Sequence, residues 1–199
     1  MPTFNRGLAM LLLLAACAWH GSSRAAEVEG VRFDDRLRLD AAHQELVLNG
    51  AGVRTKFIFK VYAIGLYLTE KVRQGREALQ LPGAKRVAIA ILMNEITADQ
   101  FMSAIREKLT AGVGTPEGEA IRHGVEHVNE IIDAVKLLKR GHTVSLDFIP
   151  GVGTRVMING EMKGHAIPGQ AFFNALLDGW IGDKPVSEAL KRSLLGLDI

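Results

Sequence analysis

The chain has 199 residues, with 24 basic and 22 acidic side chains and a formal net charge of +2. Charges of both signs are interspersed, without a basic block or a stripe of aromatic and basic residues, so the sequence does not indicate a nucleic-acid partner. The single cysteine, Cys17, excludes an intrachain disulfide. The length predicts one domain with a substantial core.

The first 26 residues have the order of a secretory signal peptide. Residues 1–6 carry a positive charge, residues 7–16 form an unbroken apolar run, and residues 20–26 are small and polar. The apolar run is about half of the roughly 20 residues that a membrane-spanning helix needs. We therefore expect export to the periplasm or the medium, no membrane span, and a single domain over residues 27–199.

Two ways of processing this signal stay open. Cleavage near Ala25 or Ala26 would release a soluble chain, and we favour this interpretation because small residues suited to cleavage end the segment. Residues 14–17, Leu-Ala-Ala-Cys, also resemble a bacterial lipobox. In that alternative Cys17 is lipidated, and the protein is a lipoprotein tethered to a membrane.

Strand patterns begin the predicted domain. Arg36–Leu39 and Glu45–Leu48 alternate between polar and apolar residues, and residues 54–68 are rich in Phe, Ile, Val and Tyr. The cluster Asn49-Gly50-Ala51-Gly52 separates these segments. This order predicts antiparallel strands with a break at the Gly/Asn cluster.

The middle of the chain mixes strand and helix patterns. A short polar helix is expected over residues 71–79, and the apolar run Arg86–Met93 predicts a strand near the sheet centre. Thr97 stands three residues before Gln100, the spacing of a capping box, and predicts the start of a helix. Residues 117–139 predict a second helix. The apolar residues that recur in the first of these two helices are Phe101, Ile105 and Leu109.

The last part of the chain returns to an alternating pattern before it ends in helices. A meander is predicted with strands at residues 142–149, 154–159 and 161–167. Asn159-Gly160 is the signal of a tight hairpin between the last two of them. Residues 169–180 and 187–195 predict helices. The whole order predicts an α+β domain with an antiparallel sheet packed against a helical layer.

Two segments resemble the chalcone isomerase family. Gly50-Ala51-Gly52-Val53-Arg54, followed by residues 61–68, resembles the central β-hairpin of that fold, and residues 172–191 resemble its C-terminal helix pair. The two motifs stand in the right order and at the right separation, so the chain is identified as a member of the bacterial chalcone isomerase-like branch. The resemblance implies an open-faced β-sandwich, with helices on one face of a long antiparallel sheet and a small meander beside them.

The resemblance implies a ligand site at Arg54 and Tyr62. Fatty-acid-binding relatives pair the hairpin arginine with a tyrosine in Val-Tyr-Ala, and Val61-Tyr62-Ala63 has this form. A guanidinium matches a carboxylate through its planar pair of donors, and a phenol adds another donor. We expect a non-catalytic binding protein for a fatty acid or a similar small amphipathic anion, without a cofactor. The other tyrosine, Tyr67, is expected on the opposite face of the strand.

The alternative that the resemblance implies is an isomerase, or intramolecular lyase, in which Arg54 stabilises an oxyanion. Plant enzymes of this fold add a threonine on the hairpin and another on the C-terminal helix. Here Tyr62 replaces the first, and Gly179, which carries no hydroxyl, stands at the second. This departure weighs against the chalcone reaction. A structural envelope protein is a further, minor alternative.

Histidines suggest two other kinds of site. Residues 123–127, His-Gly-Val-Glu-His, match the H-x-x-E-H pattern of some zinc peptidases, but the sequence shows no obvious third acidic ligand. We expect solvated or capping histidines and no metal. Haem is a minor alternative that the resemblance brings in, and its candidate axial ligands are His123, His127, His142 and His165.

Overall fold

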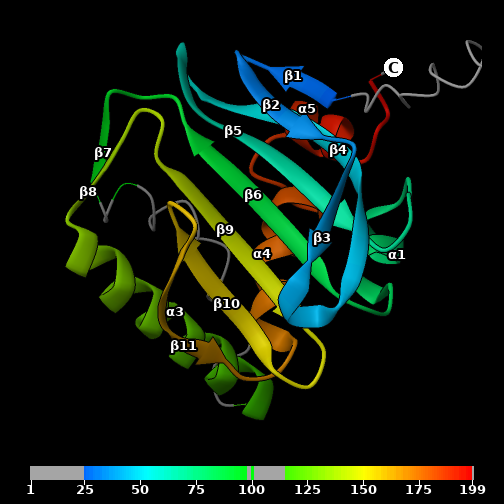
Figure 1. The fold of residues 1–199 in the computed structure, drawn as a ribbon, viewed down its shortest axis with the longest axis vertical. Helices are drawn as coiled ribbons and strands as arrows, with labels where there is room; N and C mark the ends of the chain where they lie inside the picture. Colours follow the sequence, from blue (N-terminus) through cyan, green and yellow to red (C-terminus); the bar gives the residue numbers. More distant parts are fainter. Residues whose placement is uncertain (1–24, 98–99, 101–114, 199) are drawn as a thin grey trace, which may run out of the picture.

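The computed structural model describes residues 25–97, 100 and 115–198. A seven-stranded sheet, antiparallel at every pairing, forms its centre (Figure 1). In spatial order its strands are β11 (Glu161–Ile167), β10 (Gly153–Ile158), β9 (Thr143–Ile149), β6 (Lys85–Ile91), β5 (Phe59–Leu68), β4 (Gln44–Lys56) and β3 (Arg36–Leu39). The α+β prediction is confirmed.

Helices lie on one face of this sheet, with α4 and α5 behind it and α3 along the β11 side in Figure 1. The described helices are α1 (Gly75–Gln80), α3 (Pro116–Val135), α4 (Ala171–Ile181), α5 (Glu188–Leu194) and the 3-10 turn η1 (Asp40–Ala42). Two small two-stranded sheets complete this part of the chain: the hairpin of β1 (Ala25–Val28) with β2 (Val31–Asp34), and the pairing of β7 (Glu95–Thr97) with β8 (Leu137–Lys139), which lie on either side of α3 in the chain. No described helix is both long and apolar enough to cross a membrane.

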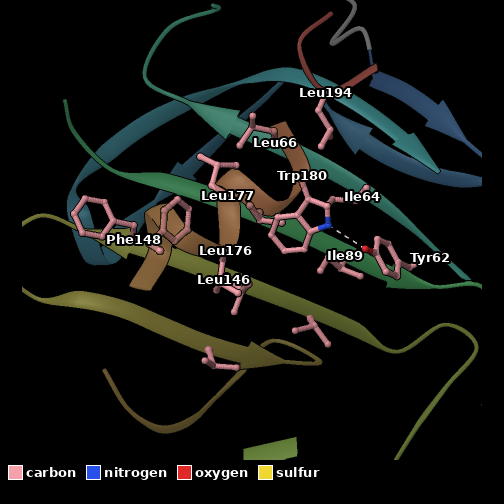
Figure 2. Close-up of a cluster of buried hydrophobic side chains, with 14 of the residues drawn as sticks. Tyr62, Ile64, Leu66, Ile89, Leu146, Phe148, Leu176, Leu177, Trp180 and Leu194 are labelled. Atoms are coloured by element: carbon pink, nitrogen blue, oxygen red, sulfur yellow. Dashed lines mark hydrogen bonds between the residues drawn. The ribbon is translucent and has the colours of Figure 1, made fainter. Parts of the chain in front are cut away.

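The core is divided between the two faces of the sheet. The larger cluster lies between the sheet and the helices (Figure 2). In it Phe148 of β9 meets Phe173 of α4, with 5.6 Å between ring centroids. On the other face Phe33 of β2 packs over the β4–β5 region. Strand β6 is the fourth of the seven, as its apolar run predicts, because both of its faces are covered.

The turn of the β4–β5 hairpin is not where the sequence predicts it. Strand β4 continues through the Asn49–Gly52 cluster, and the chain reverses at Phe57-Ile58, where Lys56 pairs with Phe59. The predicted break at the Gly/Asn cluster was wrong, because the glycine there permits close packing and does not form a turn. A Cβ atom at Gly50 would lie 2.1 Å from the carbonyl oxygen of Ser193, so the absence of a side chain lets α5 pack directly on the strand.

Asn49 is the extra residue of a β-bulge in this strand, between the pairs Leu48–Tyr67 and Gly50–Leu66. Its side chain is buried and bridges two segments: Nδ2 donates to the carbonyl oxygen of Leu194 at 2.7 Å, and Oδ1 accepts from the backbone N–H of Val72 at 2.7 Å. The polar cluster that looks like a turn is therefore the docking point of α5.

Two further boundaries and the place of the meander differ from the predictions. Helix α3 ends at Val135, because Lys136 has a left-handed backbone (φ 62°) and residues 137–139 form β8. Helix α1 begins at Gly75, four residues after its predicted start. The meander joins the main sheet through β9 and β6 and does not stand beside it. Its predicted hairpin turn is confirmed, since Asn159 and Gly160 both have positive φ.

The capping box of the first central helix is confirmed. The N–H of Gln100 donates to Thr97 Oγ1 at 3.2 Å, and the N–H of Thr97 donates to Gln100 Oε1 at 3.1 Å. The predicted apolar stripe of that helix, Phe101, Ile105 and Leu109, lies outside the described residues, as does Cys17.

Candidate functional site

Arg54 and Tyr62 stand directly opposite each other on β4 and β5. Arg54 is two residues beyond Gly52, whose missing Cβ would point at Ser193 and Leu190 of α5, so Arg54 shares the helix-facing side of the strand. The structure therefore brings together the two residues that the sequence singles out, on the side of the sheet that carries the main core.

Arg54 is half-buried. Its Nη1 donates to the carbonyl oxygen of Thr55 at 2.6 Å. Within residues 25–97, 100 and 115–198, no carboxylate forms an ion pair with it. Because guanidinium donors match carboxylate oxygens, Arg54 is available to an anionic group from outside the described chain.

Tyr62 is buried with 6% of its surface exposed, and its hydroxyl oxygen accepts a hydrogen bond from Trp180 Nε1 of α4 at 3.0 Å (Figure 2). Burial raises the pKa of the Tyr62 phenol, while the Trp180 hydrogen bond and the charge of Arg54 act in the lowering direction. The phenol therefore stays protonated at neutral pH and can act as a hydrogen-bond donor. Tyr67 lies in the opposite core cluster, which confirms its predicted face.

A second β-bulge sets the direction of the side chains next to Tyr62. Arg54 pairs with Tyr62 and Thr55 with Lys60, so Val61 is an extra residue on β5. The carbonyl oxygen of Val61 accepts hydrogen bonds from the N–H groups of Leu92 at 3.0 Å and Met93 at 3.3 Å. Val61, the neighbour of Tyr62 in the chain, lines a small cavity to which Arg54 and Tyr62 themselves contribute no surface.

This cavity has a volume of about 160 Å³ and is open at one side. Apart from one lysine and one glutamine, its lining is apolar, and the residues are Lys56, Phe57, Phe59, Val61, Met93, Ile96 and Gln100. Lys56, two residues from Arg54 on β4, brings a cation to the cavity. The arrangement suits a molecule with a negative end and a short apolar part.

The structure adds residues to this site that the sequence does not single out. Trp180 contacts Tyr62 across a sequence separation of 118 residues, and only the packing of α4 on the sheet reveals it. Lys56 reaches the cavity because the turn lies at Phe57-Ile58, and Met93 reaches it from the segment that follows β6. Gly179 is buried in α4, at the place where the resemblance implies a hydroxyl in plant enzymes.

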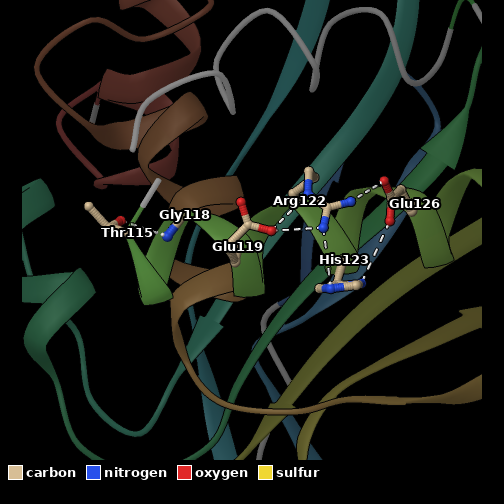
Figure 3. A network of polar contacts seen from close by, with 6 residues as sticks. All are labelled: Thr115, Gly118, Glu119, Arg122, His123 and Glu126. Carbon is tan, nitrogen blue, oxygen red and sulfur yellow. Dashed lines mark hydrogen bonds and ion pairs between the residues drawn. The ribbon is translucent and has the colours of Figure 1, made fainter. Parts of the chain in front are cut away.

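The histidines of α3 take part in local contacts. Glu126, the acid of the H-x-x-E-H pattern, pairs with Arg122 at 2.6 Å (Figure 3). The Nδ1 of exposed His123 lies 3.6 Å from Oε2 of Glu126. His127 contacts His165 of β11, with 3.8 Å between ring centroids and an angle of 39° between the ring planes. In the described ranges, no group of three His, Cys, Asp or Glu residues is placed to hold a metal ion.

His142, the remaining haem candidate, lies away from that pair. Its Nδ1 accepts from the N–H of Lys139 at 3.4 Å, in the turn between β8 and β9. Of the four histidine candidates, the structure therefore brings His127 and His165 into contact, beside a groove whose lining also includes His123.

Comparison with known proteins agrees with this architecture. A sequence model described as chalcone isomerase-like matches residues 25–196. The fold resembles a crystal structure of a fatty-acid binding protein from Arabidopsis thaliana with a TM-score of 0.60, covering 80% of this chain and 95% of that one. Their sequence identity is 15%, so this likeness concerns the fold alone. No curated protein matches the sequence. The chain belongs to the chalcone isomerase-like family.

Proposed function

We propose that this protein is an exported, non-catalytic binding protein for a fatty acid or a similar small amphipathic carboxylate. The observation that carries the proposal is the pairing of Arg54 with Tyr62 across β4 and β5, on the helix-facing side of the sheet. The guanidinium of Arg54, which has no carboxylate partner in the described chain, supplies paired donors for a carboxylate head group, and the phenol of Tyr62 lies opposite it. That the structural relative binds fatty acids supports the same class of ligand.

The cavity lined by Val61 and Lys56, on the same two strands as this pair, sets the size of the apolar part. Its volume of about 160 Å³ is close to that of an engineered cavity of ~150 Å³ that holds benzene. It is smaller than the ~300 Å³ at which typical small-molecule sites begin. The cavity therefore takes an apolar segment of roughly six carbons, and a longer chain must extend beyond it.

The head-group pair is tested by direct titration of octanoate into the full chain. Charge-assisted hydrogen bonds contribute ~1.5–3 kcal/mol each, so Arg54→Ala should weaken octanoate binding by roughly 10- to 100-fold. Tyr62→Phe removes one donor to the carboxylate and should weaken binding less. Isothermal calorimetry measures both.

The matched control is Arg73→Ala, which removes an exposed arginine outside the proposed site. It should leave octanoate binding unchanged. Equal affinity in wild type, Arg54→Ala and Arg73→Ala would contradict the assignment of Arg54. Octanol, which has the same chain and no carboxylate, should bind more weakly to wild type and be insensitive to Arg54→Ala.

Release into the periplasm or medium is the second part of the proposal. It rests on the signal-peptide pattern of residues 1–26. The mature N-terminus, read by mass spectrometry of the exported protein, should lie near Ala26. Metabolic labelling with a palmitate analogue that disappears in Cys17→Ala would show tethering through Cys17 instead.

A further inference from the structure

The turn of the β4–β5 hairpin exposes three consecutive apolar side chains, which we call the apolar tip: Phe57, Ile58 and Phe59. Their exposed fractions are 89%, 84% and 58%. Isolated exposed apolar residues are ordinary, but three in a row at the end of a long hairpin form a projecting surface. The other described large apolar residues that are exposed, Val152, Met162 and Leu197, stand singly in the sequence.

The backbone of the apolar tip is unfavourable for the residues that occupy it. Phe57 has φ 56°, a left-handed conformation that costs a side-chain-bearing residue roughly 1–2 kcal/mol and that glycine or asparagine adopts more readily. The same chain uses Asn159-Gly160 in the β10–β11 turn. A need for a stable turn therefore does not explain why Phe57 and Ile58 stand here. The property that these two residues add to the turn is an exposed apolar surface.

Basic residues stand on both strands behind the apolar tip. Lys56 is exposed and has no ion-pair partner in the described part of the chain, and Arg54 follows it inward on β4. Lys60 on β5 pairs with Glu29 at 2.6 Å. Because Glu29 neutralises one of the three cations, the charge of Arg54 and Lys56 remains and the group is positive. An apolar end with cations set back from it is complementary to an anionic lipid surface, because apolar side chains enter the acyl region while lysines stay at the head groups.

We propose that the apolar tip docks this protein on an anionic lipid surface. The cavity described above lies directly behind it, since Phe57 and Phe59 line both the surface and the cavity. Docking would place the open cavity at the level of the acyl chains. This contact goes beyond ligand binding, and its test requires no free fatty acid.

The test places a fluorescent reporter on the apolar tip of the full chain. Ile58→Trp puts an indole at the tip, and the wild-type chain, with its two tryptophans, supplies the background. On addition of phosphatidylglycerol vesicles, the emission of Ile58→Trp should shift to the blue and be quenched by brominated acyl chains. The matched control is Val152→Trp, at an exposed turn on the opposite end of the sheet, and its emission should not change.

A second variant measures the contribution of the aromatic rings. Phe57→Gly with Phe59→Thr removes both rings and gives the left-handed position a residue that prefers it, so folding is retained. Its partition coefficient on phosphatidylglycerol vesicles, measured by co-sedimentation, should fall at least tenfold from wild type. Wild-type binding should weaken at high salt and on phosphatidylcholine.

Three results would overturn the proposal. The first is unchanged emission of Ile58→Trp with vesicles, and the second is equal quenching at positions 58 and 152. The third is oligomerisation of wild type without lipid that disappears in the double variant, because the partner of the apolar tip would then be a second copy of this chain. A chain that binds no octanoate could still give all three lipid readouts, and a chain that binds octanoate could give none, so the two proposals fail separately.

Discussion

Tyr62 has a structural role as well as its proposed role in binding. Trp180 Nε1 is buried and donates to the Tyr62 hydroxyl at 3.0 Å. Removing the hydroxyl in Tyr62→Phe leaves a buried N–H without this acceptor, which costs about 1–3 kcal/mol. We expect Trp180→Phe to be destabilising as well, through both the lost hydrogen bond and the smaller ring.

The coupling between these residues is measured by urea unfolding of the two single variants and Tyr62→Phe/Trp180→Phe. Because the second substitution removes the group that the first left unpaired, the double variant should be more stable than the sum of single effects predicts. Strict additivity would show that the hydrogen bond contributes nothing to the junction of β5 and α4.

Lys85 is the fully buried charged residue of the sheet's helix-facing side, with 0% of its surface exposed. Its Nζ donates to the carbonyl oxygen of Leu79 at 3.1 Å and lies 5.7 Å from the ring centroid of Phe148. Burial lowers the pKa of Lys85 to about 8. The unfolded chain, with the ordinary lysine pKa of 10.5, therefore binds more protons between these two values than the folded chain does.

The free energy of unfolding should consequently rise as the pH increases above 8, and the same stability is lost as the pH falls back through 8. Lys85 contributes at most about 1.4 kcal/mol per pH unit to this change. Burial raises the pKa of Tyr67 to about 12, which acts in the opposite direction above pH 10, so the useful window is pH 8 to 10. Lys85→Met should lose this pH dependence in urea titrations. A variant with the same slope as wild type would contradict the lowered pKa.

At the scale of elements, the contact of β4 with α5 depends on glycine. A Cβ at Gly50 would meet two carbonyl oxygens, those of Ser193 at 2.1 Å and Leu194 at 2.7 Å. Backbone atoms cannot rotate away, so Gly50→Ala must separate the helix from the strand. We expect a loss of about 2–4 kcal/mol in the free energy of unfolding, measured by urea denaturation.

Gly151→Ala is the matched control for this prediction. Gly151 has φ 77° and open space around its Cβ position, so only the backbone preference is lost, at a cost of roughly 1–2 kcal/mol. If Gly50→Ala cost no more than Gly151→Ala, the close approach of α5 to β4 would be contradicted.

At the scale of the whole molecule, the sequence predicts what depends on local pattern. The apolar run of β6, the meander and its Asn159-Gly160 turn, and the closing helices all follow from periodicity and turn chemistry. The α+β class follows from the order of these elements, and the pairing of Arg54 with Tyr62 follows from the resemblance. What the sequence does not reveal depends on distant contacts.

Gly50 and Trp180 illustrate that limit. The glycine cluster looks like a turn because its partner, α5, lies more than 140 residues later in the chain. Trp180 looks like one more core aromatic residue until α4 is placed on the sheet beside Tyr62. Phe57-Ile58 has the residue types of a strand, and only the register of β4 with β5 identifies it as a turn.

The measurement that tests the central claim most directly is native mass spectrometry of the protein purified from its own host. We predict a co-purified fatty acid or similar carboxylate at one molecule per chain, displaced by octanoate and lost in Arg54→Ala but retained in Arg73→Ala. No bound lipid, together with a Tm that added fatty acids leave unchanged, would contradict the account.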